Sequence, residues 1–276
     1  MVIDSHQHFW KYDPVTHGWI DDSMAKIRRD FTPTDLQPIL ETNGIDGCIA
    51  VQADQTESET EYLLDCAKEH HFIKGVVGWV DLMATNVEAR LAYFAQHESL
   101  KGIRHIVQSE PNDFMLRPEF QSGIAKLSQF GLTYDILIYP QRLDAAIALV
   151  QKYPDQQFVL DHIAKPSISK GMDKAWKSKI KALGELENLY CKVSGMVTET
   201  EEFRWNVDDF KVFLDVVTQA FGVDRLMYGS DWPVCLVAAS YKEVLSIIKN
   251  YFADEELANI MGLNACKFYH LEQSGG

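Results

Sequence analysis

The sequence predicts a single domain with a (β/α)8-barrel fold, and three observations lead to this prediction. Short apolar segments recur along the 276 residues, and segments with helical spacing lie between them. Apolar strands that alternate with helices are typical of a parallel sheet covered by helices. The length matches the roughly 250 residues of a closed eight-stranded α/β barrel. No linker or low-complexity segment divides the chain, so we assign residues 1–276 to one barrel domain.

The predicted strands are rich in Val, Ile, Leu and Tyr and are bounded by Gly, Pro or Asp, as buried strands usually are. The first lies at the start of the chain, where Val2 and Ile3 favour extended structure. The other seven cover residues 46–53, 73–82, 100–108, 132–139, 157–166, 189–195 and 224–233.

The segments between the strands carry helix signals. Residues 32–44 begin with the cap-forming Thr32 and close on Gly44, and residues 117–131 end on Gly131. Apolar residues at helical intervals also occur in segments 58–71, 206–222 and 254–271. A doubly wound sheet is the alternative architecture, but no glycine-rich phosphate-binding loop follows any of the strands.

The composition excludes several classes of function. Asp and Glu number 40 against 26 Lys and Arg, which gives a formal net charge of -14. Such a surface repels phosphate backbones, so nucleic acid is not an expected partner. No apolar stretch approaches the ~20 residues that span a membrane, and no secretory signal is recognisable. The five cysteines lack metal-site or disulfide spacing. We expect a cytoplasmic protein with free thiols, either a monomer or a homo-oligomer.

The opening segment "MVIDSHQHFW" places His6 and His8 two residues apart. Residues two apart in a strand share a face, so these two imidazoles are expected to point the same way, together with Asp4. Paired nitrogen donors are typical of a metal site or of hydrolytic chemistry. A surface strand with two solvated histidines is the alternative.

Polar residues recur near the ends of the predicted strands, which is where barrel enzymes carry their active sites. These residues are His6 and His8, Gln52 and Asp54, Trp79 and Asp81, Arg104 and His105, Asp161, His162 and Lys165, Lys192 and Ser194, and Asp231 and Trp232. Each has a structural explanation when taken singly. Together they indicate one site, because a ring of desolvated charges does not stabilise a barrel.

Five motifs give the sequence a family resemblance over nearly its whole length: "DSHQHFW", "GWVDL", "KGIRHIVQ", "DHIAKP" and "YGSDWPV". In this order they resemble the amidohydrolase superfamily and, more narrowly, its lactonase branch. That branch includes hydrolases of L-fuconolactone, L-rhamnonolactone, 4-sulfomuconolactone and 2-pyrone-4,6-dicarboxylate. The resemblance implies a hydrolase of cyclic esters with a role in carbohydrate metabolism.

The resemblance also implies a catalytic and metal-binding set, namely His6, His8, His162 and Asp231. Members with two metal ions add a carboxylated lysine or a glutamate on strand four and a histidine on strand five. This sequence has Arg104 and His105 on strand four and no histidine at the end of strand five. We therefore expect at most one divalent ion, most simply zinc. Metal-independent hydrolysis stays open, because some members of the branch work without a metal.

Lactone hydrolysis requires an activated water, a stabilised oxyanion and a proton for the leaving ring oxygen. Asp231 is the expected base, with Trp232 beside it. The residues expected to bind substrate are Gln52, Trp79, Arg104, His105, Lys165, Lys192 and Trp232. A dicarboxylate would be bound best by several arginines, and the strand ends carry one. We therefore expect a neutral aldonolactone of the L-fucono or L-rhamnono type. The alternatives are a dicarboxylate lactone or muconolactone as substrate, a metal-dependent decarboxylase or amide hydrolase, and a barrel that only binds ligand.

Overall fold

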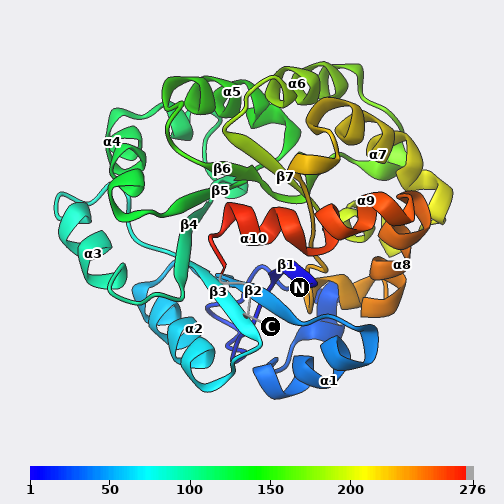
Figure 1. Cartoon of the computed structure of the whole chain (residues 1–276), viewed down its shortest axis with the longest axis horizontal. Helices are drawn as coiled ribbons and strands as arrows, with labels where there is room; N and C mark the ends of the chain where they lie inside the picture. Colours follow the sequence, from blue (N-terminus) through cyan, green and yellow to red (C-terminus); the bar gives the residue numbers. More distant parts are fainter. Residues whose placement is uncertain (272–276) are drawn as a thin grey trace.

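The computed structural model, which describes residues 1–271, contains one eight-stranded parallel sheet whose strands follow one another in chain order (Figure 1). The strands are β1 (Ile3–Gln7), β2 (Gly47–Val51), β3 (Ile73–Gly78), β4 (Leu100–Ile106), β5 (Thr133–Leu137), β6 (Phe158–Leu160), β7 (Leu189–Val193) and β8 (Leu226–Tyr228). Asp231 N–H donates to the carbonyl of His6 at 2.8 Å, and His8 N–H donates to that of Trp232 at 2.7 Å. These bonds join β1 to the segment after β8. The (β/α)8 barrel prediction is confirmed, and the last five residues of the predicted domain 1–276 lie outside the described part.

Helices cover the outside and one end of this sheet (Figure 1). They are α1 (Pro33–Asn43), α2 (Glu57–Glu69), α3 (Val87–Phe94), α4 (Pro118–Leu127), α5 (Leu143–Lys152), α6 (Lys174–Gly184), α7 (Val207–Phe221), α8 (Tyr241–Tyr251), α9 (Asp254–Ala258) and α10 (Asn264–Phe268). The expected signals set the limits of α1. Asp35 accepts a hydrogen bond from the backbone N–H of Thr32 at 2.8 Å, and Gly44 ends the helix at a φ of 71°.

Two apolar clusters form the core. The larger lies between the strands and the surrounding helices. The smaller contains side chains from several strands, such as Ile3, Val77 and Met227, which pack with Phe268 and Tyr269 at the end of the chain. Figure 1 shows α10 lying across the barrel beside the N-terminus. This end of the barrel is therefore closed by apolar packing, and the polar strand-end residues lie toward the other end.

Two further expectations can be compared with the described residues. All five cysteines are buried and unpaired by disulfides, as their spacing predicted. Within residues 1–271, no helix combines the length and the apolar character needed to cross a membrane.

Candidate active site

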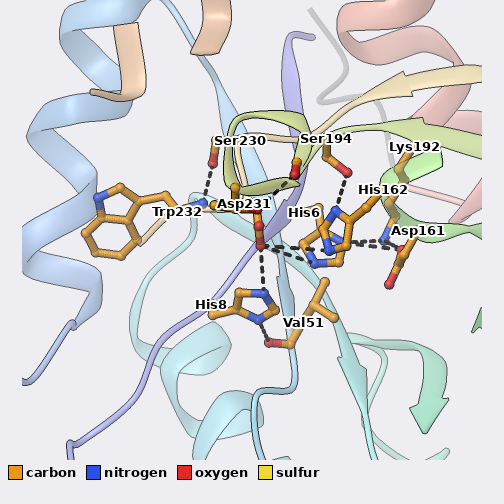
Figure 2. Close-up of polar contacts among 12 residues, drawn as sticks. His6, His8, Val51, Asp161, His162, Lys192, Ser194, Ser230, Asp231 and Trp232 are labelled. Carbon is orange, nitrogen blue, oxygen red and sulfur yellow. Dashed lines mark hydrogen bonds and ion pairs between the residues drawn. The ribbon is translucent and has the colours of Figure 1, made fainter. Parts of the chain in front are cut away.

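Three histidines and Asp231 meet at the carboxyl ends of the strands (Figure 2). His6 belongs to β1, His8 follows it, His162 follows β6 and Asp231 follows β8. The Asp231 Oδ1 atom lies 3.3 Å from His8 Nε2 and 3.9 Å from both His6 Nε2 and His162 Nε2. All four side chains are buried. The structure thus brings together the four residues that the sequence singled out as one set.

Asp4 is a correction to the strand-face prediction. Its carboxylate accepts hydrogen bonds from Tyr241 Oη of α8 at 3.0 Å and from Ser230 N–H at 2.9 Å. The pairing of β1 with β2 is irregular between Asp4 and Gln7, so the simple alternation of faces is lost there. Asp4 therefore supports the wall of the barrel and does not share the site with His6 and His8.

The backbone around His162 adopts an unusual conformation. His162, Ile163, Ala164 and Lys165 all have left-handed φ values, between 49° and 60°, and Asp231 has a φ of 55°. Such residues cost of order 1–3 kcal/mol each and are concentrated at functional sites. Five of the eight left-handed non-glycine residues among residues 1–271 thus lie in the two segments that carry His162, Lys165 and Asp231.

Glycines make room for two of the imidazoles. A Cβ on Gly195 would lie 2.6 Å from His162 Nδ1, and one on Gly229 would lie 2.6 Å from His6 Cβ. Gly195 also has a φ of 64°, which other residues rarely adopt. These two loops can therefore approach the histidines only because no side chain intervenes.

The hydrogen bonds of His8 fix the direction of its lone pair. His8 Nδ1 lies 2.7 Å from the carbonyl oxygen of Val51, which can only accept, so Nδ1 carries the hydrogen. The unprotonated Nε2 of a neutral His8 then faces the Asp231 carboxylate at 3.3 Å. Two acceptors at this distance require a proton or a cation between them. This donor set therefore fits a bound divalent ion.

Two groups of side chains have their ligand atoms close enough for an ion. One is His6, His8 and Asp231, and the other is His6, Asp161 and His162; within each group the atoms lie within 4.8 Å of one another. His6 Nδ1 lies 3.3 Å from Asp161 Oδ1, an arrangement that orients ligating histidines in metal proteins.

The ionisation of the site follows from its burial. Burial alone would raise the pKa of Asp231, but the neighbouring His162 and the hydrogen bond with His8 hold it well below its usual range. Burial lowers the pKa of His162 to about 4. Near pH 7 the site thus contains a carboxylate beside a neutral His162.

A buried network of charges lies against His6. Lys192 Nζ is 2.5 Å from Asp135 Oδ2, 3.2 Å from Asp161 Oδ1 and 3.2 Å from His6 Nδ1. Tyr269, which follows α10, donates to Asp135 Oδ2 at 2.9 Å. A continuous set of contacts therefore runs from the closed end of the barrel to the histidines.

Arg104 and Gln52 extend this network on the other side of His6. Arg104 Nη1 donates to Asp161 Oδ2 at 3.0 Å and lies 3.3 Å from His6 Nε2. Arg104 Nη2 donates to the Gln52 side-chain oxygen at 3.1 Å and also to the Gln52 carbonyl. The structure thus places these side chains among buried polar groups. Arg104 and Lys192 contact His6, and Gln52 contacts Arg104.

Trp79 and His105 form a separate pair. The indole N–H of Trp79 can only donate, and it lies 3.2 Å from His105 Nδ1. The hydrogen of His105 is therefore on Nε2, which donates to Glu110 Oε1 at 3.1 Å. His105 also stacks on Phe114, with ring centroids 4.8 Å apart. Both nitrogens of His105 are thus engaged in joining the loops after β3 and β4.

Trp232 and Lys165 complete the predicted substrate-binding residues. The Trp232 ring packs against Phe9 and Phe31 and points away from the histidines in Figure 2. Lys165 Nζ lies 3.1 Å from Glu199 Oε1, and each side chain is 16% exposed. The structure therefore separates Trp232 from the cluster and leaves Lys165 partly accessible.

Glu199 was absent from the predicted site, and Asp161 was named among the polar strand-end residues without a role. Asp161 directly precedes His162, and strand alternation would place neighbouring residues on opposite faces. The left-handed turn that begins at His162 removes this constraint, and no sequence periodicity reveals such a turn. Glu199 lies in an acidic run after the seventh strand. Its closeness to a strand end was the one signal available.

Comparisons with known proteins agree with this geometry. The family model described as Amidohydrolase matches residues 3–271. An L-fucono-1,5-lactonase from Burkholderia ambifaria is 34% identical over 284 residues, which cover 99% of this chain and 97% of the relative. An L-fucono-1,5-lactonase from Burkholderia multivorans is also 34% identical, over 98% of this chain and 96% of the relative. A solved amidohydrolase from Burkholderia multivorans with bound zinc superposes with a TM-score of 0.94 at 35% identity, covering 99% of this chain and 100% of that one. The whole barrel, including the residues of the histidine cluster, thus lies within the matched region, and the chain belongs to the amidohydrolase family.

Proposed function

We propose that the protein hydrolyses sugar lactones, and in particular six-carbon aldonolactones such as L-fucono-1,5-lactone. The observation that carries the proposal is the buried Asp231 carboxylate held among three imidazoles at the carboxyl ends of the strands. The two L-fucono-1,5-lactonases that match almost the whole chain support the choice of substrate.

In the proposed mechanism Asp231 acts as the general base. Its depressed pKa keeps it ionised near pH 7, so it can take a proton from the attacking water. The water oxygen bonds to the lactone carbonyl carbon, and the carbonyl becomes an oxyanion. The bond to the ring oxygen then breaks, and the alkoxide so formed recovers the proton from Asp231.

His162 is the imidazole best suited to stabilise the oxyanion. The Ser194 hydroxyl lies 2.8 Å from His162 Nδ1 and can donate to it, which leaves the ring hydrogen on Nε2. Because burial keeps His162 neutral near pH 7, its Nε2–H is available as a hydrogen-bond donor.

Alternatively, His6, His8, His162 and Asp231 would hold one divalent ion, and zinc suits this nitrogen and oxygen set. In that case the Ser194 hydroxyl would accept the hydrogen of His162 Nδ1, so that Nε2 would bind the ion and not the oxyanion. When bound, the ion would supply Lewis-acid polarisation of the carbonyl. The zinc-bound solved relative supports this assignment. Arg104 and Lys192 pair with Asp161 at 3.0 and 3.2 Å, and these positive charges oppose a second ion at the group that contains Asp161.

The charge pairing in the site favours a neutral substrate. Arg104 is paired with Asp161, Lys192 with Asp135 and Asp161, and Lys165 with Glu199. A dicarboxylate would have to compete with these protein carboxylates for each cation. A polyhydroxylated neutral ring needs only hydrogen-bonding groups.

A hydrolysis screen tests the proposed function. Acid release is followed with a pH indicator over a panel of 1,4- and 1,5-aldonolactones, a muconolactone and 2-pyrone-4,6-dicarboxylate. We expect kcat/KM to be highest for the six-carbon sugar lactones. A clear preference for the dicarboxylate would overturn the choice of substrate, and no hydrolysis of any lactone would overturn the proposed function.

A further inference from the structure

The Lys165–Glu199 ion pair borders a cavity that the proposed chemistry does not use. The cavity has a volume of about 440 Å³ and is lined by the loops after β5, β6 and β7, with Tyr139, Gln141, Lys165, Ser167, Trp176 and Glu199 among its lining residues. Lys165 ends the left-handed turn that begins at His162, and Glu199 lies in the segment after β7, which also carries Ser194 at 2.8 Å from His162. The cavity is thus bordered by the two loops that position His162.

The ion pair is poorly explained by stability alone. Both side chains are 16% exposed, and two charges moved this far out of water gain little net free energy from their attraction. Lys165 also has a φ of 49°, a conformation that a lysine adopts only at a cost. A pair retained under these conditions is better explained by a ligand that uses it.

Both charged groups have unused hydrogen-bonding capacity. Lys165 has three donor hydrogens, and its polar contacts are Glu199 at 3.1 Å and Gln108 Oε1 at 3.4 Å. Over residues 1–271, Lys165 is the one hydrogen-bonding or ionic partner recorded for the Glu199 carboxylate, whose two oxygens can accept several hydrogen bonds. The face toward the cavity can therefore both donate and accept.

We propose that Lys165 and Glu199 form a clamp for the hydroxyl groups of the sugar ring, with Glu199 as a specificity-determining residue. This inference rests on the proposed function and assigns the cavity to the sugar part of the substrate. Adjacent ring hydroxyls donate to the carboxylate and accept from the ammonium group, so the ion pair need not separate. An anionic substrate is repelled by Glu199, whereas an unsubstituted lactone ring offers neither group a hydrogen bond.

The first test compares two lactones with the same six-membered ring. L-fucono-1,5-lactone carries hydroxyls, and δ-valerolactone carries none. Glu199→Gln should lower kcat/KM for the sugar lactone about 10- to 100-fold more than for δ-valerolactone, the usual range for a hydrogen bond to a charged group. Lys165→Met should shift the preference in the same direction and replaces the first variant if that one does not fold.

The matched control is Asp215→Asn, which removes a carboxylate from an exposed pair with Lys211 at 2.9 Å on α7. It should leave the kcat/KM values for both lactones unchanged. Equal losses on the two lactones in Glu199→Gln would overturn the clamp, because the residue would then serve the chemistry common to both. An unchanged preference would overturn it as well.

A binding measurement separates the clamp from the proposed hydrolysis. The probe is 1,5-anhydro-L-fucitol, which has the ring hydroxyls but no carbonyl, titrated into the protein by calorimetry. We expect Glu199→Gln to weaken its Kd at least ~10-fold. If the wild type binds the probe through Glu199 yet opens no lactone, the clamp stands and the lactonase proposal falls. An affinity that Glu199→Gln does not change would overturn the clamp even in an active lactonase.

Discussion

Lys192→Met is the perturbation that tests the buried charge network most sharply. Lys192, Asp135 and Asp161 have fully buried side chains, and the ammonium lies 2.5 Å from one carboxylate and 3.2 Å from the other. Methionine fills a similar volume without charge. Within residues 1–271, the Tyr269 hydroxyl at 2.9 Å is then the one side-chain partner of Asp135, and Asp161 keeps Arg104 at 3.0 Å and His6 at 3.3 Å. Two carboxylates would then share one cation in the barrel interior.

The magnitude follows from the burial of these groups. Removing one partner from a buried ion pair costs about 3–5 kcal/mol in the free energy of unfolding. In a chain of 276 residues, a loss of about 1 kcal/mol lowers the unfolding midpoint by about 2 °C. We therefore expect Lys192→Met to lower the midpoint by roughly 6–10 °C.

The assay is thermal unfolding followed by circular dichroism, with Lys179→Met as the matched control. Lys179 pairs with Asp144 at 2.7 Å, but Asp144 is 75% exposed, so the loss should not exceed about 1 kcal/mol. The double variant Lys192→Met/Asp135→Asn should lose less than the sum of the single variants, because the two residues interact directly. Equal midpoints for the two lysine variants would refute the reasoning.

Three further predictions follow from the same structure. Elemental analysis should find at most one equivalent of divalent metal per chain, and two tightly bound equivalents would contradict the opposing charges beside His6. Tyr269→Phe should lower the free energy of unfolding by about 1–2 kcal/mol in urea titrations, because Asp135 loses a buried donor; no loss would mean that this bond does not support the network. Burial raises the pKa of Glu59 to about 8, so the folded state retains a proton that the unfolded state releases as the pH rises from about 4.5 to 8. The free energy of unfolding of the wild type should therefore fall relative to that of Glu59→Gln over this range. An equal difference between the two proteins at pH 5 and at pH 8 would count against the raised pKa.

The alternation of strands and helices is visible in the sequence because its cause is local. Apolar runs such as residues 46–53 and 100–108 can be buried only in the interior of a sheet, and caps such as Thr32 and Gly44 act within one helical turn. Residues at the carboxyl ends of parallel strands also meet whatever their distance in the chain. This rule places His6, His8, His162 and Asp231 among the polar strand-end residues, and the family resemblance then implies these four as one set.

The direction of individual side chains could not be predicted in the same way. Trp232 directly follows Asp231, yet its ring packs against Phe9 and Phe31, because the left-handed backbone at Asp231 changes the course of the chain. Arg104 and Lys192 were expected to face substrate, and the structure pairs both with buried carboxylates. Such pairings depend on contacts between distant strands, which residue spacing does not record.

The most direct test of the account is the turnover of L-fucono-1,5-lactone by Asp231→Asn. Asparagine keeps the shape of the side chain but cannot accept a proton from water, so kcat should fall at least ~100-fold while circular dichroism shows an intact fold. Asp215→Asn, measured in the same pH-indicator assay, should retain the wild-type rate. A folded Asp231→Asn variant with near-normal kcat would contradict the assignment of Asp231 as the base.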